Sequence, residues 1–210
     1  MTLLRVDASI QGTHSASSEL ADLVLAEWTA AHPDRPVLRR HLAADPLPAH
    51  AWPAAIGGAF TPDEHRTDTQ RAALTLAAGL AAELRDAHAA ILALPLYNFG
   101  VSQHVKTWID LAIAGGERDE KLLDGTPVVL LTTRGGAYGP GTPREGWDHN
   151  TGYLRRILVD MWGADLTVVE REFTLVGINP ALDQFTDLAA AMKATAHDAA
   201  TAAGKTLATR

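Results

Sequence analysis

Two runs of this sequence are apolar at almost every position, and they constrain the fold more than any other feature. Residues 88–95 are His-Ala-Ala-Ile-Leu-Ala-Leu-Pro, and residues 125–133 are Gly-Thr-Pro-Val-Val-Leu-Leu-Thr-Thr. A strand that is buried on both faces has this pattern, whereas a half-exposed strand alternates apolar and polar residues. Both runs therefore predict central strands of a parallel sheet that is covered by helices on both sides.

Weaker patterns on either side of these runs predict the remaining elements. Further strands are expected at 3–6, 37–42 and 164–172, the second of them at or near an edge of the sheet. Helices are expected from Ser15 or Ser17 onward and at 67–86, 102–114, 151–162 and 180–204. Residues 43–66 are rich in Pro and Gly, and we expect a long surface connection there with one helical turn.

Five strands that alternate with helices predict an α/β fold, a three-layer sandwich around one parallel sheet. Right-handed crossovers leave few topologies, of which the strand order 2-1-3-4-5 is the first candidate. A length of 210 residues suits one domain over residues 1–210. In a sheet of this order, ligands bind beyond the carboxyl ends of strands 1, 3 and 4. The loops 8–17, 95–101 and 133–147 should therefore meet in one crevice.

Composition excludes several classes of protein. The chain has no cysteine, which excludes disulfides, thiolate metal sites and a cysteine nucleophile and suits a reducing cytoplasm. Its nine histidines show no metal-ligand spacing, so we expect no metal site. A formal net charge of −7 argues against a nucleic-acid binder. No apolar run approaches the roughly 18 residues of a membrane span, and the N-terminus lacks a signal-peptide core. We expect a soluble, cytoplasmic protein that binds neither nucleic acid nor membrane.

The first loop, after the strand at 3–6, offers hydroxyl groups and the N–H groups of a helix N-terminus. These groups suit one phosphate, and the loop lacks both Gly-x-x-x-x-Gly-Lys-Ser/Thr and Gly-x-Gly-x-x-Gly. A monophosphate cofactor therefore fits best, and the alternative is that the serines only cap the helix. The candidate residues are Ser9, Ser15, Ala16 and Ser17.

The second and third loops offer groups that suit a flat ring. Two aromatic side chains and an amide follow the strand at 88–95, and the alternative is that the aromatics pack under the next helix. An Arg and two Gly follow the strand at 125–133, where N–H groups can stabilise negative charge on a ring, and the alternative is a plain flexible turn. The candidates are Leu96, Tyr97, Asn98 and Phe99, with Thr133, Arg134, Gly135 and Gly136. Together, the three loops favour a bound flavin mononucleotide (FMN).

On these residues, with 95–99 continuing as Lys106-Thr-Trp-Ile-Asp110, the chain resembles the flavodoxin-like FMN-dependent NADH:quinone oxidoreductases, also called FMN-dependent azoreductases. The resemblance covers nearly the whole chain. It implies that Ser9 and residues 15–17 hold the phosphate, that residues 96–99 line one side of the isoalloxazine, and that residues 133–136 cover its pyrimidine edge. It also implies a homodimer with active sites at the subunit interface, and residues 46–62 would then reach toward the partner's flavin.

The resemblance further implies that NADH or NADPH passes a hydride through tightly bound FMN to a small aromatic quinone or azo acceptor in a ping-pong cycle. No catalytic side chain is predicted, because water can protonate a reduced quinone. The alternatives are a specialised flavin-dependent reductase of a biosynthetic intermediate and a non-enzymatic flavodoxin-like electron carrier. Relatives carry a longer, aromatic insertion where this chain has the short, charged segment 115–124. We therefore expect residues 137–150 to form part of the substrate pocket, with Tyr138 and His149 as candidate contacts.

Overall fold

The computed structural model describes all 210 residues and contains one sheet of five parallel strands. Its order is β2-β1-β3-β4-β5, with parallel pairing at every step, which confirms the predicted topology. The two apolar runs contain the whole of β3 and β4, in the interior of the sheet, and β2 lies at an edge as expected. The strand bounds are β1 Leu3–Asp7, β2 Val37–His41, β3 Ala89–Ala93, β4 Pro127–Thr133 and β5 Asp165–Arg171.

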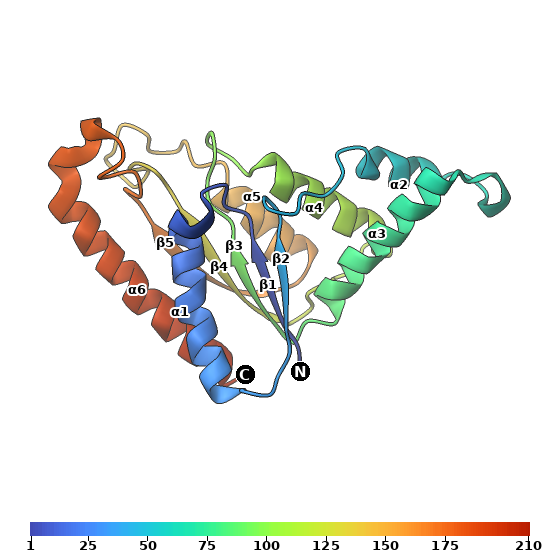
Figure 1. The fold of residues 1–210 in the computed structure, drawn as a ribbon, viewed down its shortest axis with the longest axis horizontal. Helices are drawn as coiled ribbons and strands as arrows, with labels where there is room; N and C mark the ends of the chain where they lie inside the picture. The colour runs from blue at the N-terminus through green and yellow to red at the C-terminus, as the bar shows by residue number, and fades with distance from the viewer.

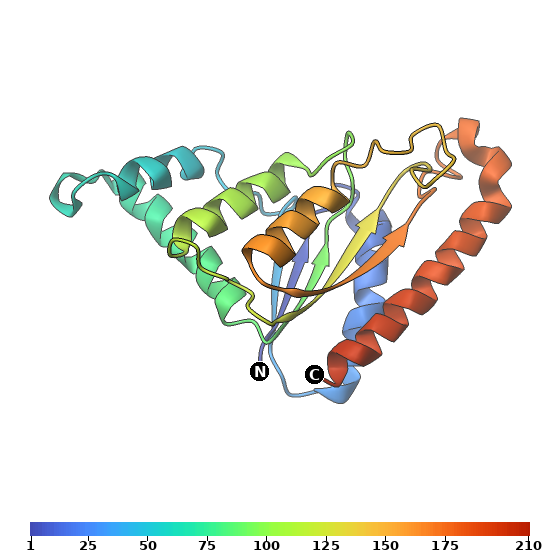
Figure 2. The ribbon, with the colours of Figure 1, turned by 180° about the vertical axis from the view of Figure 1, so that it is seen from behind.

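Helices cover both faces of the sheet, as Figures 1 and 2 show from opposite sides. The helices α1 (Ala16–Ala31) and α6 (Thr186–Ala208) lie together on one face. The other face carries α3 (Asp68–Arg85), α4 (Gln103–Gly115) and α5 (Thr151–Arg155). The strands point their carboxyl ends away from both chain termini, so the loops that follow β1, β3 and β4 gather at the opposite end of the molecule (Figure 1). No helix is both long and apolar enough to cross a membrane.

Residues 43–66 are more regular than the sequence predicts. They contain a nine-residue helix, α2 (Ala51–Ala59), followed by a single 3₁₀ turn at Asp63–His65. Pro53 does not interrupt α2, because it lies in the first turn, where its missing N–H has no intrahelical acceptor. The buried face of α2 packs on α3, and Gly58 allows the close approach of Leu74 and Gln70.

The predicted helix at 151–162 is helical over almost its whole length, but it changes from α-helix to a π-helical segment at Arg156–Met161. The last helix begins at the predicted residue as the 3₁₀ helix η4 (Pro180–Phe185), which precedes α6. The α6 helix runs through Gly204 instead of ending there. A Cβ atom at position 204 would lie 2.9 Å from the Val24 carbonyl oxygen of α1. Gly204 is therefore a packing residue between two helices and not a helix stop.

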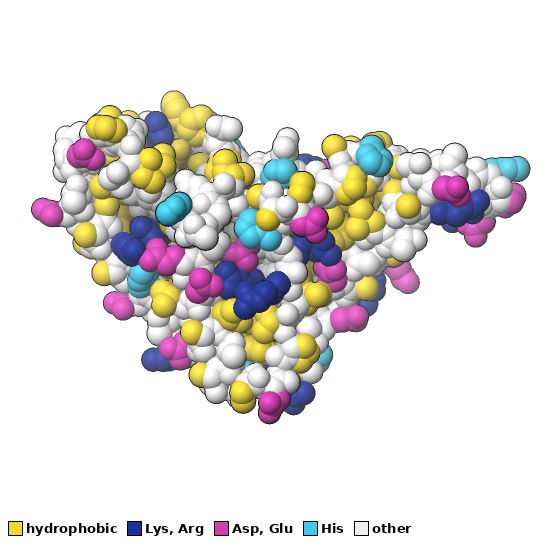
Figure 3. All heavy atoms as spheres, in the orientation of Figure 1, with side chains coloured by type: hydrophobic (Ala, Val, Ile, Leu, Met, Phe, Trp, Pro, Cys, Tyr) yellow, Lys and Arg dark blue, Asp and Glu magenta, His cyan; other side chains and the backbone are white.

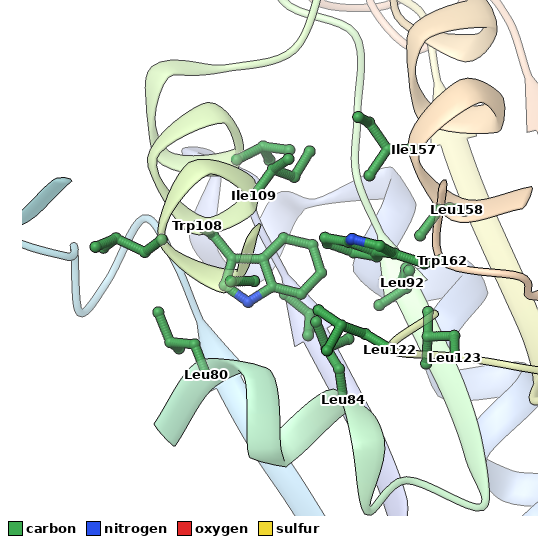
Figure 4. Close-up of a cluster of buried hydrophobic side chains, with 14 of the residues drawn as sticks. Leu80, Leu84, Leu92, Trp108, Ile109, Leu122, Leu123, Ile157, Leu158 and Trp162 are labelled. Atoms are coloured by element: carbon green, nitrogen blue, oxygen red, sulfur yellow. The ribbon is translucent and has the colours of Figure 1, made fainter. Parts of the chain in front are cut away.

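Each face of the sheet has its own hydrophobic core. The larger core lies under α3 and α4, where Trp108 and Trp162 meet edge to face with ring centroids 5.7 Å apart (Figure 4). The two cores hold the sheet as a rigid platform, which fixes the positions from which the three predicted loops leave it.

Candidate functional site

A cavity of about 940 Å³ lies at the carboxyl ends of β1, β3 and β4, where the three loops meet. Its size is that of a site for a cofactor or another small molecule. Eight of the twelve predicted residues line it: Ser9, Ala16, Leu96, Tyr97, Asn98, Thr133, Gly135 and Gly136. The other four, Ser15, Ser17, Phe99 and Arg134, lie beside the cavity without lining it.

The Tyr97 hydroxyl group joins the first loop to the second. The Ile10 N–H donates to Tyr97 Oη at 3.0 Å, and the hydroxyl oxygens of Ser9 and Tyr97 lie 3.3 Å apart. The Gln11 N–H donates in turn to Ser9 Oγ at 3.2 Å. These bonds hold the Tyr97 ring against the cavity and fix Ser9 at its wall.

The start of α1 presents backbone donors to the cavity. Ser15 Oγ accepts the Ser18 N–H at 3.1 Å and lies 3.1 Å from Ser17 Oγ, and both side chains are buried. The Ser15 hydroxyl therefore caps the helix, as the alternative interpretation of this loop allowed. The N–H groups of Ala16 and Ser17 have no acceptor within the chain. An anion at this helix end would meet those two N–H groups and the Ser9 hydroxyl.

The second loop turns sharply just beyond β3. Tyr97 and Gly100 exchange both backbone hydrogen bonds at 2.9 Å, and Asn98 and Phe99 between them have φ angles of 46° and 71°. Two residues with positive φ form the tight turn that normally contains Asn and Gly, so Phe99 is strained there.

The strained Phe99 packs on the third loop and not under the next helix. Its ring lies 5.4 Å from that of Trp147 and 6.3 Å from that of Tyr138. The His149 N–H also donates to the Phe99 carbonyl at 2.9 Å. The second and third loops are thus joined outside the cavity by an aromatic cluster and one backbone bond.

The segment 133–136 pairs with residues 173–175 through its carbonyl groups and leaves two N–H groups free. The carbonyls of Arg134, Gly135 and Gly136 accept the N–H groups of residues 174, 175 and 173. The N–H groups of Gly135 and Gly136 have no acceptor within the chain. A Cβ atom on Gly135 would lie 2.6 Å from Leu175 Cδ1, so a larger residue at position 135 would displace the Leu175 side chain.

The Arg134 side chain points away from the cavity, which the sequence pattern does not predict. Its buried guanidinium donates to Asp148 at 2.8 Å and to Glu170 at 2.6 Å, and it lies 3.5 Å from Glu172. Burial lowers the pKa of Arg134, but the bonds and charges of Glu170 and Asp148 outweigh this and raise it. Arg134 is therefore a permanently charged anchor for the third loop and not a ligand-facing cation.

The rest of the cavity wall comes partly from the predicted pocket segment 137–150 and partly from residues after β5, which the sequence did not single out. Of the predicted segment, residues 137–144 line the cavity, including the candidate contact Tyr138, whereas Trp147 and the other candidate, His149, do not. Apolar side chains that follow β5 in the chain also line the cavity: Leu175, Leu182, Phe185, Leu188 and Met192, in η4, α6 and the segment before them. Their helical spacing was visible, but it is also the spacing of an ordinary core-facing stripe.

The donor set fits FMN. One end of the cavity has neutral N–H and hydroxyl donors at a helix N-terminus, which suit a phosphate. The third loop contributes the free N–H groups of Gly135 and Gly136, which suit the polar edge of a flat heterocycle, and the Tyr97 ring, which lines the same cavity, suits its face. No group of three or more His, Asp or Glu side chains is placed to hold a metal ion.

Comparison with known protein families gives an independent result. A family described as having a flavodoxin-like fold matches residues 1–198. The chain is 40% identical over 191 residues to an FMN-dependent NADH:quinone oxidoreductase of Frankia alni, covering 89% of this chain and 90% of that protein. It is 37% identical over 213 residues to one from Streptomyces avermitilis, covering 100% of this chain and 98% of that protein.

Solved structures agree on the fold. The crystal structure of the azoreductase AzrA superposes with a TM-score of 0.80 at 22% identity, covering 98% of this chain and 100% of that one. An FMN-dependent NADH-azoreductase of Bacillus anthracis, solved in complex with FMN, gives 0.70 at 17% identity, covering 97% and 99% of the two chains.

Proposed function

Because the chain belongs to the flavodoxin-like fold family, we propose that it is an FMN-dependent oxidoreductase. It passes a hydride from NADH or NADPH through bound FMN to a quinone or azo acceptor. Relatives named FMN-dependent NADH:quinone oxidoreductases, at 34–40% identity over most of the chain, support this activity and this cofactor. The 210 residues act as one flavin-binding domain.

One observation of the structure carries the proposal. A single cavity is lined by Ala16 at the N-terminus of α1 and by Gly135 and Gly136 of the third loop, and the backbone N–H groups of all three residues have no acceptor within the chain. The Tyr97 ring lines the same cavity, and its hydroxyl group bonds to the first loop. A ligand with an anionic tail and a flat, carbonyl-bearing ring matches that distribution of donors, and FMN is such a ligand.

In this reaction the residues of the chain bind FMN and orient it. When bound, FMN supplies the hydride chemistry, accepting from a nicotinamide and donating to the acceptor. The N–H groups of residues 16 and 17 with the Ser9 hydroxyl would hold the phosphate. The N–H groups of Gly135 and Gly136 would stabilise negative charge on the ring at no cost of reorganisation, because the 173–175 segment already fixes them. No protein acid or base is required.

The phosphate assignment is tested by Ala16→Asp. Asp is favourable in the first turn of a helix, so this variant should fold, but its carboxylate would face the FMN phosphate. We expect affinity for FMN to fall more than about tenfold, since like charges in contact repel strongly. Affinity for riboflavin, which lacks the phosphate, should change little. Both are measured by flavin fluorescence titration of apoprotein.

Gln103→Asp is the matched control, because it places the same side chain at the first position of α4, outside the cavity. It should leave both affinities unchanged. Equal FMN affinity in Ala16→Asp and the wild-type protein would contradict the phosphate site. Equal loss of FMN and riboflavin would show general damage to the cavity.

Turnover separates an enzyme from the electron-carrier alternative. Purified holoprotein is mixed with NADH or NADPH and a small quinone or azo compound, and oxidation of the nicotinamide is followed. Parallel double-reciprocal plots are expected, because donor and acceptor occupy the same place in turn in a ping-pong cycle. Bound FMN without turnover would favour the carrier, and activity restricted to one class of acceptor would favour the specialised reductase.

We further propose that the protein is a cytoplasmic homodimer. Apolar residues of α2 support the dimer: Trp52, Ile56 and Phe60 recur every four residues on one exposed face, and Phe60 is 87% exposed. In Figure 3, apolar side chains gather on the upper right of the molecule, where Figure 1 places α2. A face of this kind on a chain without membrane spans suits a second copy of the chain.

A further inference from the structure

The segment that covers the cavity contains two arginines with opposite electrostatic surroundings. Arg134 faces Asp148, Glu170 and Glu172, so its charge is more than neutralised. Arg144 has no carboxylate oxygen within 4 Å. Its neighbour Glu145 forms no ion pair with it, and that carboxylate instead accepts the Gly141 N–H at 2.8 Å.

Arg144 is held at the cavity by an aromatic ring. Its guanidinium carbon lies 5.6 Å from the centre of the Tyr138 ring, and Nη1 donates to Tyr138 Oη at 3.3 Å. A Cβ atom built on Gly136 would lie 3.5 Å from Arg144 Nη1. The positive charge therefore lies beside the backbone donors of the third loop, at the end of the cavity that suits a flat ring.

The cavity wall has one unpaired charge, which is positive. Arg144 and Glu172 are the only charged residues that line it. Glu172 is engaged, because its Oε1 accepts the Tyr138 N–H at 2.8 Å and faces Arg134. The wall contributed by Leu175, Leu182 and Phe185 is apolar. One uncompensated cation beside an apolar wall suits a flat, apolar molecule that carries one negative group.

We propose that Arg144 selects acceptors bearing an anionic group, such as a quinone or azo compound with a carboxylate or a sulfonate. The inference rests on the proposed function and names its substrate class. The reaction is unchanged: NAD(P)H loses a hydride and becomes NAD(P)⁺, and a quinone gains that hydride and one proton from water to become the quinol. The phosphates of the donor suit Arg144 less well, because a ribose separates them from the nicotinamide ring, whereas Arg144 lies beside the ring end of the cavity.

The test measures the two half-reactions separately in a stopped-flow instrument. FMN-loaded protein is reduced by NADH without oxygen and then mixed with a naphthoquinone sulfonate or with neutral menadione. In Arg144→Gln we expect the second-order rate constant for the sulfonate to fall about tenfold. The constant for menadione and the rate of reduction by NADH should stay within about twofold. Salt should slow the sulfonate reaction in wild-type protein and much less in the variant.

Two variants control for charge and for packing. Arg144→Lys keeps the positive charge and should recover most of the sulfonate rate. Arg118→Gln removes the same charge from a fully exposed side chain in the loop that precedes β4, at the other end of the strands, and should leave both rates unchanged. An equal loss with both quinones would overturn the proposal in favour of a role in supporting the loop. A loss confined to the NADH step would overturn it in favour of binding the donor's phosphates.

A binding measurement keeps this inference separate from the proposed function. Naphthalene sulfonate cannot be reduced, and its affinity is measured by calorimetry next to that of the neutral naphthalene methanol. If wild-type protein shows no turnover but Arg144→Gln loses affinity for the sulfonate alone, the proposed function fails and the anion site stands. If the variant binds both compounds as the wild-type protein does, the anion site fails.

Discussion

At the scale of single residues, Asp148 connects the third loop of the cavity to the start of α5. Its Oδ1 accepts the N–H groups of Asn150 and Thr151 at 2.8 and 2.9 Å, and its Oδ2 accepts the Thr151 hydroxyl and the Arg134 guanidinium. Burial raises the pKa of Asp148, but these hydrogen bonds and the charge of Arg134 outweigh it, so the pKa lies below its ordinary value. The ionised carboxylate therefore stabilises the folded protein above the ordinary pKa of aspartate. That contribution is lost as the pH falls through the folded-state pKa.

Asp148→Asn tests this linkage. At neutral pH the free energy of unfolding of the variant should be about 2 kcal/mol lower than that of wild-type protein, because the variant loses hydrogen bonds to a charged acceptor. The difference from wild-type protein should shrink as the pH falls below the ordinary pKa of aspartate and through the lower folded-state pKa, because the wild-type carboxylate then becomes protonated as well. Urea unfolding at several pH values measures both. Asp198→Asn, on the exposed side of α6 and in no ion pair, should have little effect at any pH. A pH-independent difference in the Asp148 variant would contradict the argument.

The same residues show what sequence can and cannot predict at this scale. That the residues around Tyr97 and Gly135 belong to one cavity follows from strand order alone, since parallel strands end at the same edge of the sheet. The direction of the Arg134 side chain does not follow from strand order, because its three carboxylate partners lie 14 to 38 residues further along the chain. The strained turn at Phe99 was also not predictable, because a bulky residue is rare at positive φ.

At the scale of the elements, two helical glycines should respond oppositely to the same substitution. A Cβ atom on Gly115 of α4 would lie 1.9 Å from the Ala77 carbonyl oxygen of α3, so Gly115→Ala must push the two helices apart. We expect a loss of about 1–3 kcal/mol in the free energy of unfolding. Gly79 is exposed within α3, and a methyl group added there would meet no atom within 4 Å, so Gly79→Ala should stabilise by about 0.5–1 kcal/mol. Urea unfolding of both variants checks the signs, and a stabilised Gly115→Ala would refute the packing argument.

Packing between helices is also where the predicted element bounds failed. Helix α3 was predictable from its apolar spacing and its capping residue Thr67. Helix α2 was not, because its Pro and Gly are typical of loops, and it owes its helical form to burial on α3. The extension of α6 past Gly204 has the same origin, since local propensity at a glycine favours an end while contact with α1 requires the small residue.

At the scale of the whole molecule, ion pairs join the helical layers to the last strand. Glu19 of α1 accepts Arg171 of β5 at 2.8 Å and lies 2.7 Å from Lys193 of α6. Burial raises the pKa of Glu19, and the bonds from Lys193 and Arg171 lower it by more. The side of the molecule that carries η4 and α6 is thus held together by charge as well as by its core. Helix α2, at the opposite end in Figure 1, packs mainly on the helices α3 and α4 and leaves its outer apolar face open.

We expect the proposed homodimer to form through the exposed apolar face of α2, and charged substitutions on that face test this. Replacing Ile56 and Phe60 together by Asp would place two charges in the centre of an apolar contact, which costs several kcal/mol when the charges are unpaired. We expect the wild-type protein to sediment at twice the mass of one chain and the double variant at the mass of one chain over the same range of concentration. Both side chains are at least 39% exposed in the single chain, so the circular dichroism spectrum should not change. Ile178→Asp, at a position 67% exposed near the other end of the molecule, should remain a dimer. A double variant that still sediments as a dimer would place the contact elsewhere, and a wild-type protein at the mass of one chain would refute the dimer itself.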